Sequence, residues 1–149
     1  MAPRVLVVVF PSEEWSQLFQ ARLNANASYS EAAVAWEGDI LLVVLPSDPS
    51  GHGSGVHLDL GHGQCRSARL VPDPSGVESE FRFEATRANW SRLMNHEVDP
   101  VRAILDGTLR VKGNLGKLMR FTRASKELVE TAAGIPTEIA EDRPAVSRP

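Results

Sequence analysis

The chain has 149 residues, a formal net charge of -3 and 42% hydrophobic residues, which suits one domain with an ordinary core and is too short for two. Its composition is close to the globular average and excludes a disordered or membrane-embedded class of protein. The slightly acidic balance, with a pI near 5.8, excludes the broad positive field that attracts nucleic acid.

The only cysteine is Cys65, so no disulfide can form within the chain. The first apolar run, residues 5–10, is shorter than a signal-peptide core and is followed by Glu13 and Glu14. No apolar stretch approaches the roughly 20 residues that cross a bilayer. We therefore expect a cytoplasmic protein without a membrane anchor.

The first elements are expected to be helical. Ser12 is a good N-cap, and Trp15, Phe19 and Leu23 recur at helical spacing, which predicts a helix to about residue 25. A short helical turn is expected over residues 30–35. The continuous apolar run 40–45 then predicts a strand that is buried on both faces.

Three further strands are predicted at residues 56–60, 65–71 and 81–85. The first and last alternate apolar and polar residues, and turns rich in Gly and Pro separate the three. Because the strands follow one another closely, we expect an antiparallel meander.

The pattern after residue 86 becomes helical again. Trp90, Leu93 and Met94 predict one helix, and Asp99 followed by Pro100 begins a second that ends near residue 107. A short strand is expected over 109–112 and one long helix over 114–132. We expect a single domain over residues 1–136, with the placement of 1–10 open, and a mobile tail over 137–149 because that segment is rich in charge and Pro.

Four sequence segments occur in a distinctive order: Trp90-Ser-Arg-Leu-Met94, then Val98-Asp-Pro100 in a helix ending at Gly107, then Leu109-Arg-Val-Lys-Gly113, then an apolar final helix. The order resembles the C-terminal half of the sterol carrier protein-2 family. Two earlier segments are similar to small standalone bacterial members of the family: Phe10-Pro-Ser-Glu-Glu-Trp15 and Trp36-Glu-Gly-Asp-Ile40. With them, the resemblance covers roughly residues 10–132.

The resemblance implies an α+β fold: a five-stranded, mostly antiparallel sheet with helices packed on one face. It also implies an apolar tunnel that accepts a sterol, fatty acid or acyl chain, with no cofactor and no catalytic residue, so we expect binding or transfer of lipid and no enzyme. The predicted lining residues are Trp90, Ile104, Leu105, Leu109, Val111, Leu118 and Met119. We expect the final helix, with adaptable Met119, to form a wall or lid of the cavity.

Two alternatives of other classes remain open. One is a protein-interaction module with a filled core and no ligand. The other is a hydrolase centred on His57, Asp59, His62 and Cys65. The same residues together with His52 suggest a metal site, although they lack the fixed spacing of a zinc motif.

Two further features concern the segment before the final helix. Gly113 and Gly116 beside Lys112 could hold a phosphate, but a simple strand-to-helix turn explains them better. The basic residues between Arg110 and Lys126 form either a solvated face or a patch that meets lipid head groups or an acidic partner. The sequence thus leaves transient membrane contact and the oligomeric state open.

Overall fold

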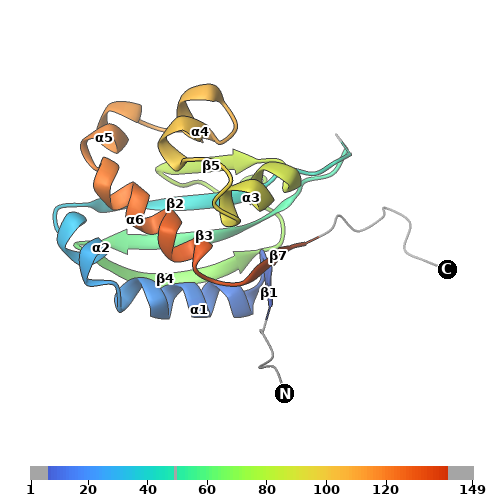
Figure 1. The fold of residues 1–149 in the computed structure, drawn as a ribbon. Helices are drawn as coiled ribbons and strands as arrows, with labels where there is room; N and C mark the ends of the chain where they lie inside the picture. Colours follow the sequence, from blue (N-terminus) through green and yellow to red (C-terminus); the bar gives the residue numbers. More distant parts are fainter. Residues whose placement is uncertain (1–6, 49, 141–149) are drawn as a thin grey trace, which may run out of the picture.

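The computed structural model describes residues 7–48 and 50–140, and Figure 1 shows their course. The elements follow in the order β1 (Val8–Phe10), α1 (Glu13–Asn24), α2 (Ala27–Ala32), β2 (Glu37–Val44), β3 (Ser54–Gly61), β4 (Gln64–Val71), β5 (Phe81–Ala85), α3 (Arg87–Met94), α4 (Pro100–Asp106), β6 (Arg110–Lys112), α5 (Leu115–Arg120), α6 (Thr122–Ala133) and β7 (Thr137–Ile139). The α+β class is confirmed.

The main sheet has five strands in the order β4-β3-β2-β5-β6. Its neighbours are antiparallel except β2 and β5, which run parallel, with Ile40 opposite Phe81. The mostly antiparallel sheet is confirmed, but the simple meander is wrong at β5. That strand does not pair with β4: it crosses the sheet to β2, where Phe81 and Phe83 join the main core.

Local capping explains why two predicted helices form where expected. The Ser12 hydroxyl accepts from the Trp15 amide at 3.0 Å and begins α1, and the Asp99 carboxylate accepts from the Arg102 amide at 3.1 Å and begins α4. Gly107, with φ of 84°, ends α4 in the left-handed conformation. The helical turn expected at 30–35 starts earlier, because Asn26 caps α2 by accepting from the Tyr29 amide.

The final helix is not continuous as predicted. It divides into α5 and α6 at Phe121, where φ of -116° and ψ of 37° interrupt the helix. The turn brings the Phe121 ring edge-on against Trp36, with ring centroids 5.1 Å apart. An aromatic contact with a residue far away in the sequence therefore accompanies a break that helical periodicity alone could not reveal.

The segment after α6 is ordered further than expected. Thr137 begins β7, which pairs in parallel with β1, and the Trp15 indole donates to the Thr137 hydroxyl at 3.2 Å. The predicted start of the tail at 137 is therefore wrong. Residues 141–149, the rest of that predicted tail, lie outside the described residues.

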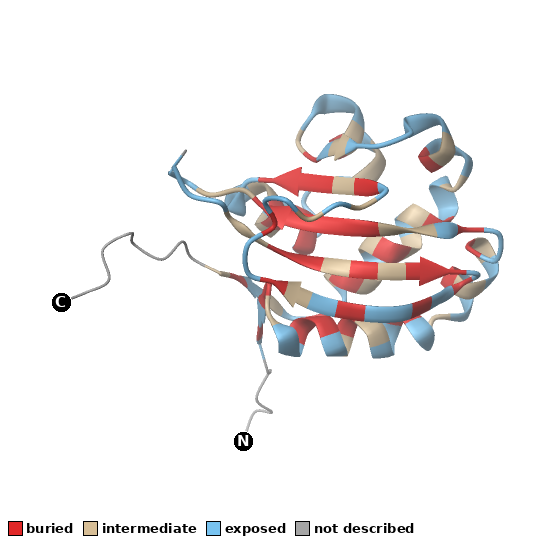
Figure 2. Ribbon diagram, turned by 180° about the vertical axis from the view of Figure 1, so that it is seen from behind, coloured by how far each residue is buried: buried red, intermediate tan, exposed pale blue. Residues whose placement is uncertain are grey.

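The helices pack on one face of the main sheet, and the core lies between the two layers (Figure 1). On the opposite face, which Figure 2 shows from the front, Leu41, Val43 and Val71 form a smaller buried cluster with Leu45 and Val77. The connection from β4 to β5 carries Val77 over this face. The strand β2 is thus buried on both faces, as its apolar run predicted.

Candidate functional site

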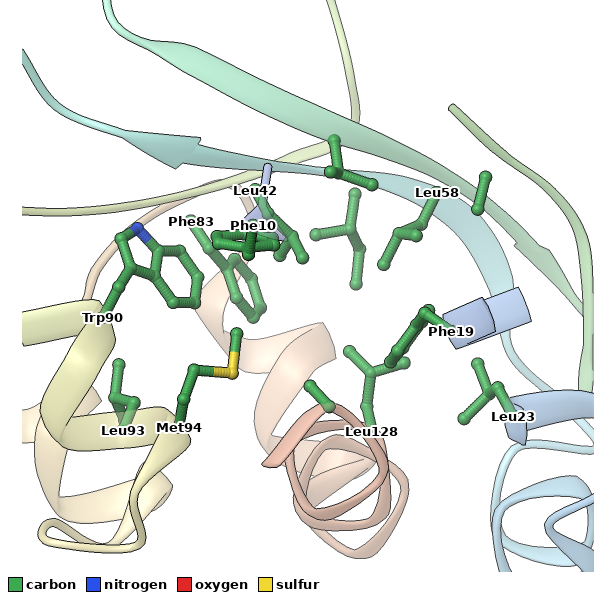
Figure 3. Packing of buried hydrophobic residues seen from close by; sticks show 14 of the residues in the cluster. Phe10, Phe19, Leu23, Leu42, Leu58, Phe83, Trp90, Leu93, Met94 and Leu128 are labelled. Atoms are coloured by element: carbon green, nitrogen blue, oxygen red, sulfur yellow. The ribbon is translucent and has the colours of Figure 1, made fainter. Parts of the chain in front are cut away.

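A void of about 30 Å³ lies between the centre of the sheet and the helices. Its walls come from α1, β2, β5, α3, the start of the β6 segment and α6, and they expose no polar surface to it. Figure 3 shows several of these side chains pointing toward one another from the sheet and from α6. The lining residues are Phe19, Leu42, Phe83, Trp90, Leu93, Met94, Leu109, Leu128, Val129 and Ala132.

A second void, of about 10 Å³, lies along the same face of the sheet toward α2 and α5. Leu128 of α6 lines this void as well as the first, so the two voids share one wall residue. The walls are Tyr29, Trp36, Ile40, Leu60, Leu118, Phe121, Ala124, Ser125 and Leu128.

The second void is polar only at a few atoms. The Trp36 indole already donates to the Gly38 carbonyl at 2.9 Å. Burial raises the pKa of Tyr29 far above its usual value, with a smaller contribution from nearby Cys65, so this hydroxyl stays neutral. Among the described residues that line the two voids, none is charged at neutral pH. The space suits an uncharged, apolar occupant.

A groove of about 270 Å³ lies on the surface where the α3–α4 connection faces α6. Its walls include His96, Val98 and Lys126, and it shares Leu93 and Val129 with the first void. The groove and the apolar void thus share two wall residues.

The structure brings three of the predicted lining residues to these voids. Trp90 and Leu109 line the first void, and Leu118 lines the second. The Trp90 indole donates to the Val43 carbonyl at 2.8 Å, which fixes the ring against the sheet. Ile104 and Val111 are partly buried and pack on the core without lining either void.

The other two predicted residues lie at the surface. Leu105 is 73% exposed and Met119 is 36% exposed. In α4 the buried position belongs to Ala103, and in α5 it belongs to Leu118, which was also predicted; a neighbour on a helix points about 100° away from the residue beside it. The predicted helix faces were therefore misplaced by one or two residues.

Sequence reasoning missed several lining residues that come from the strands and from α6. Leu42, Phe83 and Leu128 occupy central positions in the walls. For Phe83 the signal was available, because it belongs to the alternating apolar set of the strand predicted at 81–85. The strand predicted at 40–45 was expected to be buried on both faces, so its pattern did not single out Leu42. For Leu128 no local signal separates a cavity wall from ordinary core.

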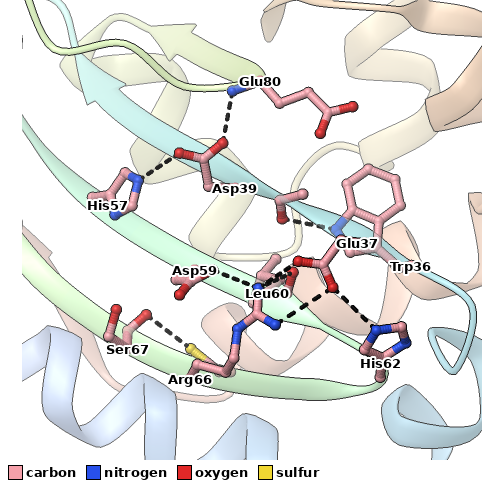
Figure 4. Close-up of polar contacts among 12 residues, drawn as sticks. Trp36, Glu37, Asp39, His57, Asp59, Leu60, His62, Arg66, Ser67 and Glu80 are labelled. Atoms are coloured by element: carbon pink, nitrogen blue, oxygen red, sulfur yellow. Dashed lines mark hydrogen bonds and ion pairs between the residues drawn. The ribbon is translucent and has the colours of Figure 1, made fainter.

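The candidate histidine and cysteine residues do not form one cluster; Figure 4 shows His57 and His62 apart, each beside a different carboxylate. Cys65 lies in the main core, where its thiol donates to the Ser67 carbonyl at 3.3 Å. His57 lies on the opposite face and bonds Asp39 at 2.8 Å. Burial, helped by the negative charge of Asp59, raises the pKa of Cys65 to about 12, which removes the thiolate that a nucleophile needs.

Asp59 and His62 belong to one surface network of ion pairs, which Arg66 and Glu37 connect at 2.7 Å. Asp59 pairs with Arg66 at 2.8 Å, and His62 pairs with Glu37 at 3.2 Å. His52 is exposed in the loop before β3. Within residues 7–48 and 50–140, no three His, Cys, Asp or Glu side chains come together as metal ligands.

Gly113, which lies between β6 and α5, has a structural explanation. Gly113 has φ of 137°, and a Cβ added there would lie 2.5 Å from the Phe81 ring and 2.8 Å from the Glu80 carbonyl. Only glycine permits this backbone to pass so close to β5. The turn therefore serves packing at the β5–β6 edge.

None of the described helices is long and apolar enough to cross a membrane.

The chain was compared with known proteins. The model of the SCP-2 sterol transfer family matches residues 16–126. Stomatin-like protein 1 of Mus musculus is 30% identical over 104 residues, which are 70% of this chain and 24% of that protein. The chain thus spans about a quarter of the length of this curated relative.

Two structures are similar over nearly their whole length. A crystal structure of sterol carrier protein 2 is 35% identical with a TM-score of 0.77, over 83% of this chain and 97% of that one. The solution structure of a conserved hypothetical protein from Thermus thermophilus, described as a candidate sterol carrier protein, is 32% identical with a TM-score of 0.76, over 92% and 96%. The chain therefore belongs to the SCP-2 sterol transfer family, whose domain binds or transfers lipid.

Proposed function

We propose that this protein binds a lipid-like molecule between the sheet and α6, and passes it on without chemical reaction. The observation that carries this proposal is the pair of voids with apolar walls, which share Leu128 as a wall residue. An acyl chain gains about 0.8 kcal/mol for each methylene group that it buries in such surroundings. The ligand classes that fit are fatty acids, sterols and isoprenoids.

The voids are smaller than any of these ligands, so uptake requires the walls to separate. The helix α6 is the wall suited to move, because it lines both voids and its N-terminus at Phe121 has no side-chain cap. A rotation of Leu128 would join the two voids into one channel along the sheet. This describes a pocket that is collapsed without ligand and opens with it.

The absence of a reaction is also part of the proposal. The hydroxyls of Tyr29 and Ser125 are the oxygen-bearing side chains at the voids, and no histidine or carboxylate of the described chain lines the voids beside them. A hydroxyl needs such a base to act as a nucleophile. The lining residues therefore favour binding over catalysis.

The test uses delipidated protein and a fluorescent fatty-acid probe, with a matched pair of variants on α6. Ala132 lines the first void, whereas its neighbour Ala133 lines the outer groove. We expect Ala132→Leu to weaken probe binding at least tenfold, because the added atoms occupy ligand volume, and Ala133→Leu to leave it unchanged. A probe that binds both variants and the wild type equally would place the ligand outside these voids and contradict the proposal.

The alternative of an interaction module without a ligand is favoured by one observation, the small volume of the two voids. It predicts that protein purified without delipidation carries no lipid in native mass spectrometry. It also predicts that emptied protein binds neither an acyl nor a sterol probe. Both results together would replace lipid binding with this alternative.

A further inference from the structure

The two voids differ in the polar groups at their walls. The walls of the first void expose no polar surface to it. The second void has two hydroxyl-bearing side chains among its walls, Tyr29 of α2 and Ser125 of α6. Since Leu128 lines both voids, the space available to a ligand has a wholly apolar end and an end with two hydroxyl groups.

Neither hydroxyl group has a hydrogen-bond partner within residues 7–48 and 50–140. Tyr29 is only 2% exposed, and its hydrogen bonds come from its backbone, to Asn26 and Ala33. The hydrogen bond of Ser125 is also a backbone one, to the Phe121 carbonyl. A buried hydroxyl group that lacks a partner costs free energy, so a ligand that supplies one is bound more tightly.

The second void has room for one small polar group. Its volume of about 10 Å³ is close to the smallest space that holds a single water molecule. A hydroxyl or carbonyl oxygen of a ligand therefore fits there, whereas a phosphate or sugar head group does not fit without displacing the aromatic walls Trp36 and Phe121.

The charges around the second void disfavour an ionised ligand. None of its described wall residues is charged at neutral pH. Lys117 lies 4.8 Å from the centre of the Trp36 ring, but its ammonium group donates to Glu80 and to the Glu37 carbonyl, both at 2.7 Å. An ionised carboxylate buried at this end would lose its hydration without gaining a cation.

We infer that the second void holds the polar end of the ligand, and that this end is a neutral oxygen group, bonded by the hydroxyl groups of Tyr29 and Ser125. The favoured ligand is a long-chain or ring-system alcohol, whose hydrocarbon part extends past Leu128 into the first void. A fatty acid adopts this orientation only when its carboxyl group is protonated. The inference deepens the proposed lipid function and rests on it.

The surface groove is the other place with polar groups near the ligand space. Its charged or titratable wall residues are all exposed: His96, Glu97, Asp99, Lys126 and Glu130. Water already satisfies exposed groups of this kind, so a ligand gains little by replacing it. The buried hydroxyl group of Tyr29 gains more from a ligand, which favours the second void.

The test compares dodecanol, dodecanoate and dodecane as competitors that displace the fluorescent probe from delipidated protein. At about pH 8 dodecanol should act at a concentration at least about tenfold lower than dodecanoate, because a buried polar end excludes the charge. The ratio should shrink toward about pH 5, as the acid becomes neutral. Tyr29→Phe and Ser125→Ala should each weaken dodecanol binding about five- to tenfold, the value of one hydrogen bond, and leave dodecane unaffected.

The matched control is Ser28→Ala, which removes an exposed hydroxyl group beside Tyr29 on α2 and should bind dodecanol like the wild type. Urea unfolding checks that each variant is folded, and Ser125→Ala carries the test if Tyr29→Phe is not.

Three results overturn this inference alone. One is equal displacement by dodecanol and dodecanoate at about pH 8, which would leave the polar end in water. Another is that the Tyr29 and Ser125 variants bind dodecanol like Ser28→Ala, or lose dodecanol and dodecane equally. The third is that Lys126→Gln weakens binding of both polar ligands while Tyr29→Phe does not, which would place the polar end in the groove. A wild-type protein that binds neither the probe nor any of the three ligands overturns the proposed function instead.

Discussion

At the scale of single residues, Cys65 shows how burial determines chemistry. Burial raises the pKa of its thiol to about 12, so almost no thiolate is present near neutral pH. We predict that iodoacetamide at about pH 8 leaves the native protein unmodified in mass spectrometry, whereas the urea-unfolded chain reacts fully. Rapid alkylation of the native protein would mean that Cys65 is accessible and would revive the nucleophile hypothesis.

The contacts of Asp39 predict how the stability of the fold depends on pH. Its burial raises the pKa of the carboxyl group, but hydrogen bonds from the Glu80 amide and the His57 ring outweigh this effect and lower it. A lowered pKa means that the ionised carboxylate stabilises the fold above the pKa of the unfolded chain. That contribution is lost as the pH falls through the lower pKa of the folded protein.

The variant Asp39→Ala should therefore lose about 1–3 kcal/mol of unfolding free energy at neutral pH, because it leaves the Glu80 amide and the largely buried His57 ring without their partner. The difference from the wild type should shrink at acidic pH, where the wild-type carboxyl group is also protonated. Urea unfolding at several pH values measures both effects. A difference that stays constant down to about pH 2 would show that Asp39 does not act through its charge.

The dispersed histidine residues predict independence from metal. His57 and His62 each bond a different carboxylate, and Cys65 lies in the core on the far side of the sheet from His57. We expect a chelator to leave both the melting temperature and probe binding unchanged. Stoichiometric zinc whose removal lowers the melting temperature would contradict this arrangement.

At the scale of elements, α4 was predicted closely because its signals are local. Asp99, Pro100 and Gly107 each act within one turn of the helix. We predict that Gly107→Ala costs about 1 kcal/mol in unfolding free energy through its positive φ alone, since a Cβ there meets nothing within 4 Å. The control Gly107→Asn should cost less, because Asn tolerates the left-handed region. Equal costs would indicate a steric cause instead.

The elements that sequence reasoning placed wrongly depend on distant contacts. The alternating pattern of β5 reveals which side chains turn inward, but it is the same whether the strand pairs with β4 or with β2. The break at Phe121 accompanies packing on Trp36, which lies before the whole sheet in the sequence. The periodicity of the sequence predicts neither the pairing of β5 with β2 nor the contact of Phe121 with Trp36.

At the scale of the whole molecule, the family fold was predictable while the site was predictable only in part. That the predicted residues contact a ligand stays a prediction; of them, Trp90, Leu109 and Leu118 line the voids, because each lies on the inward side of its segment. Leu105 and Met119 do not, because in short helices an error of one position moves a side chain from the core to solvent. The contribution of Leu128 to both voids depends on how α6 lies on the sheet.

The pairing of β5 with β2, and of β7 with β1, also affects how fast the chain folds. Pairing within β2, β3 and β4 is local, but Ile40 must find Phe81, and Val8 must find Thr137. Closing such long loops costs entropy before any contact repays it. The local hairpins of β2, β3 and β4 should therefore be formed in the folding transition state, and β1 should pair with β7 only after it. In stopped-flow experiments, Val56→Ala should mainly slow refolding, whereas Ile139→Val should mainly accelerate unfolding.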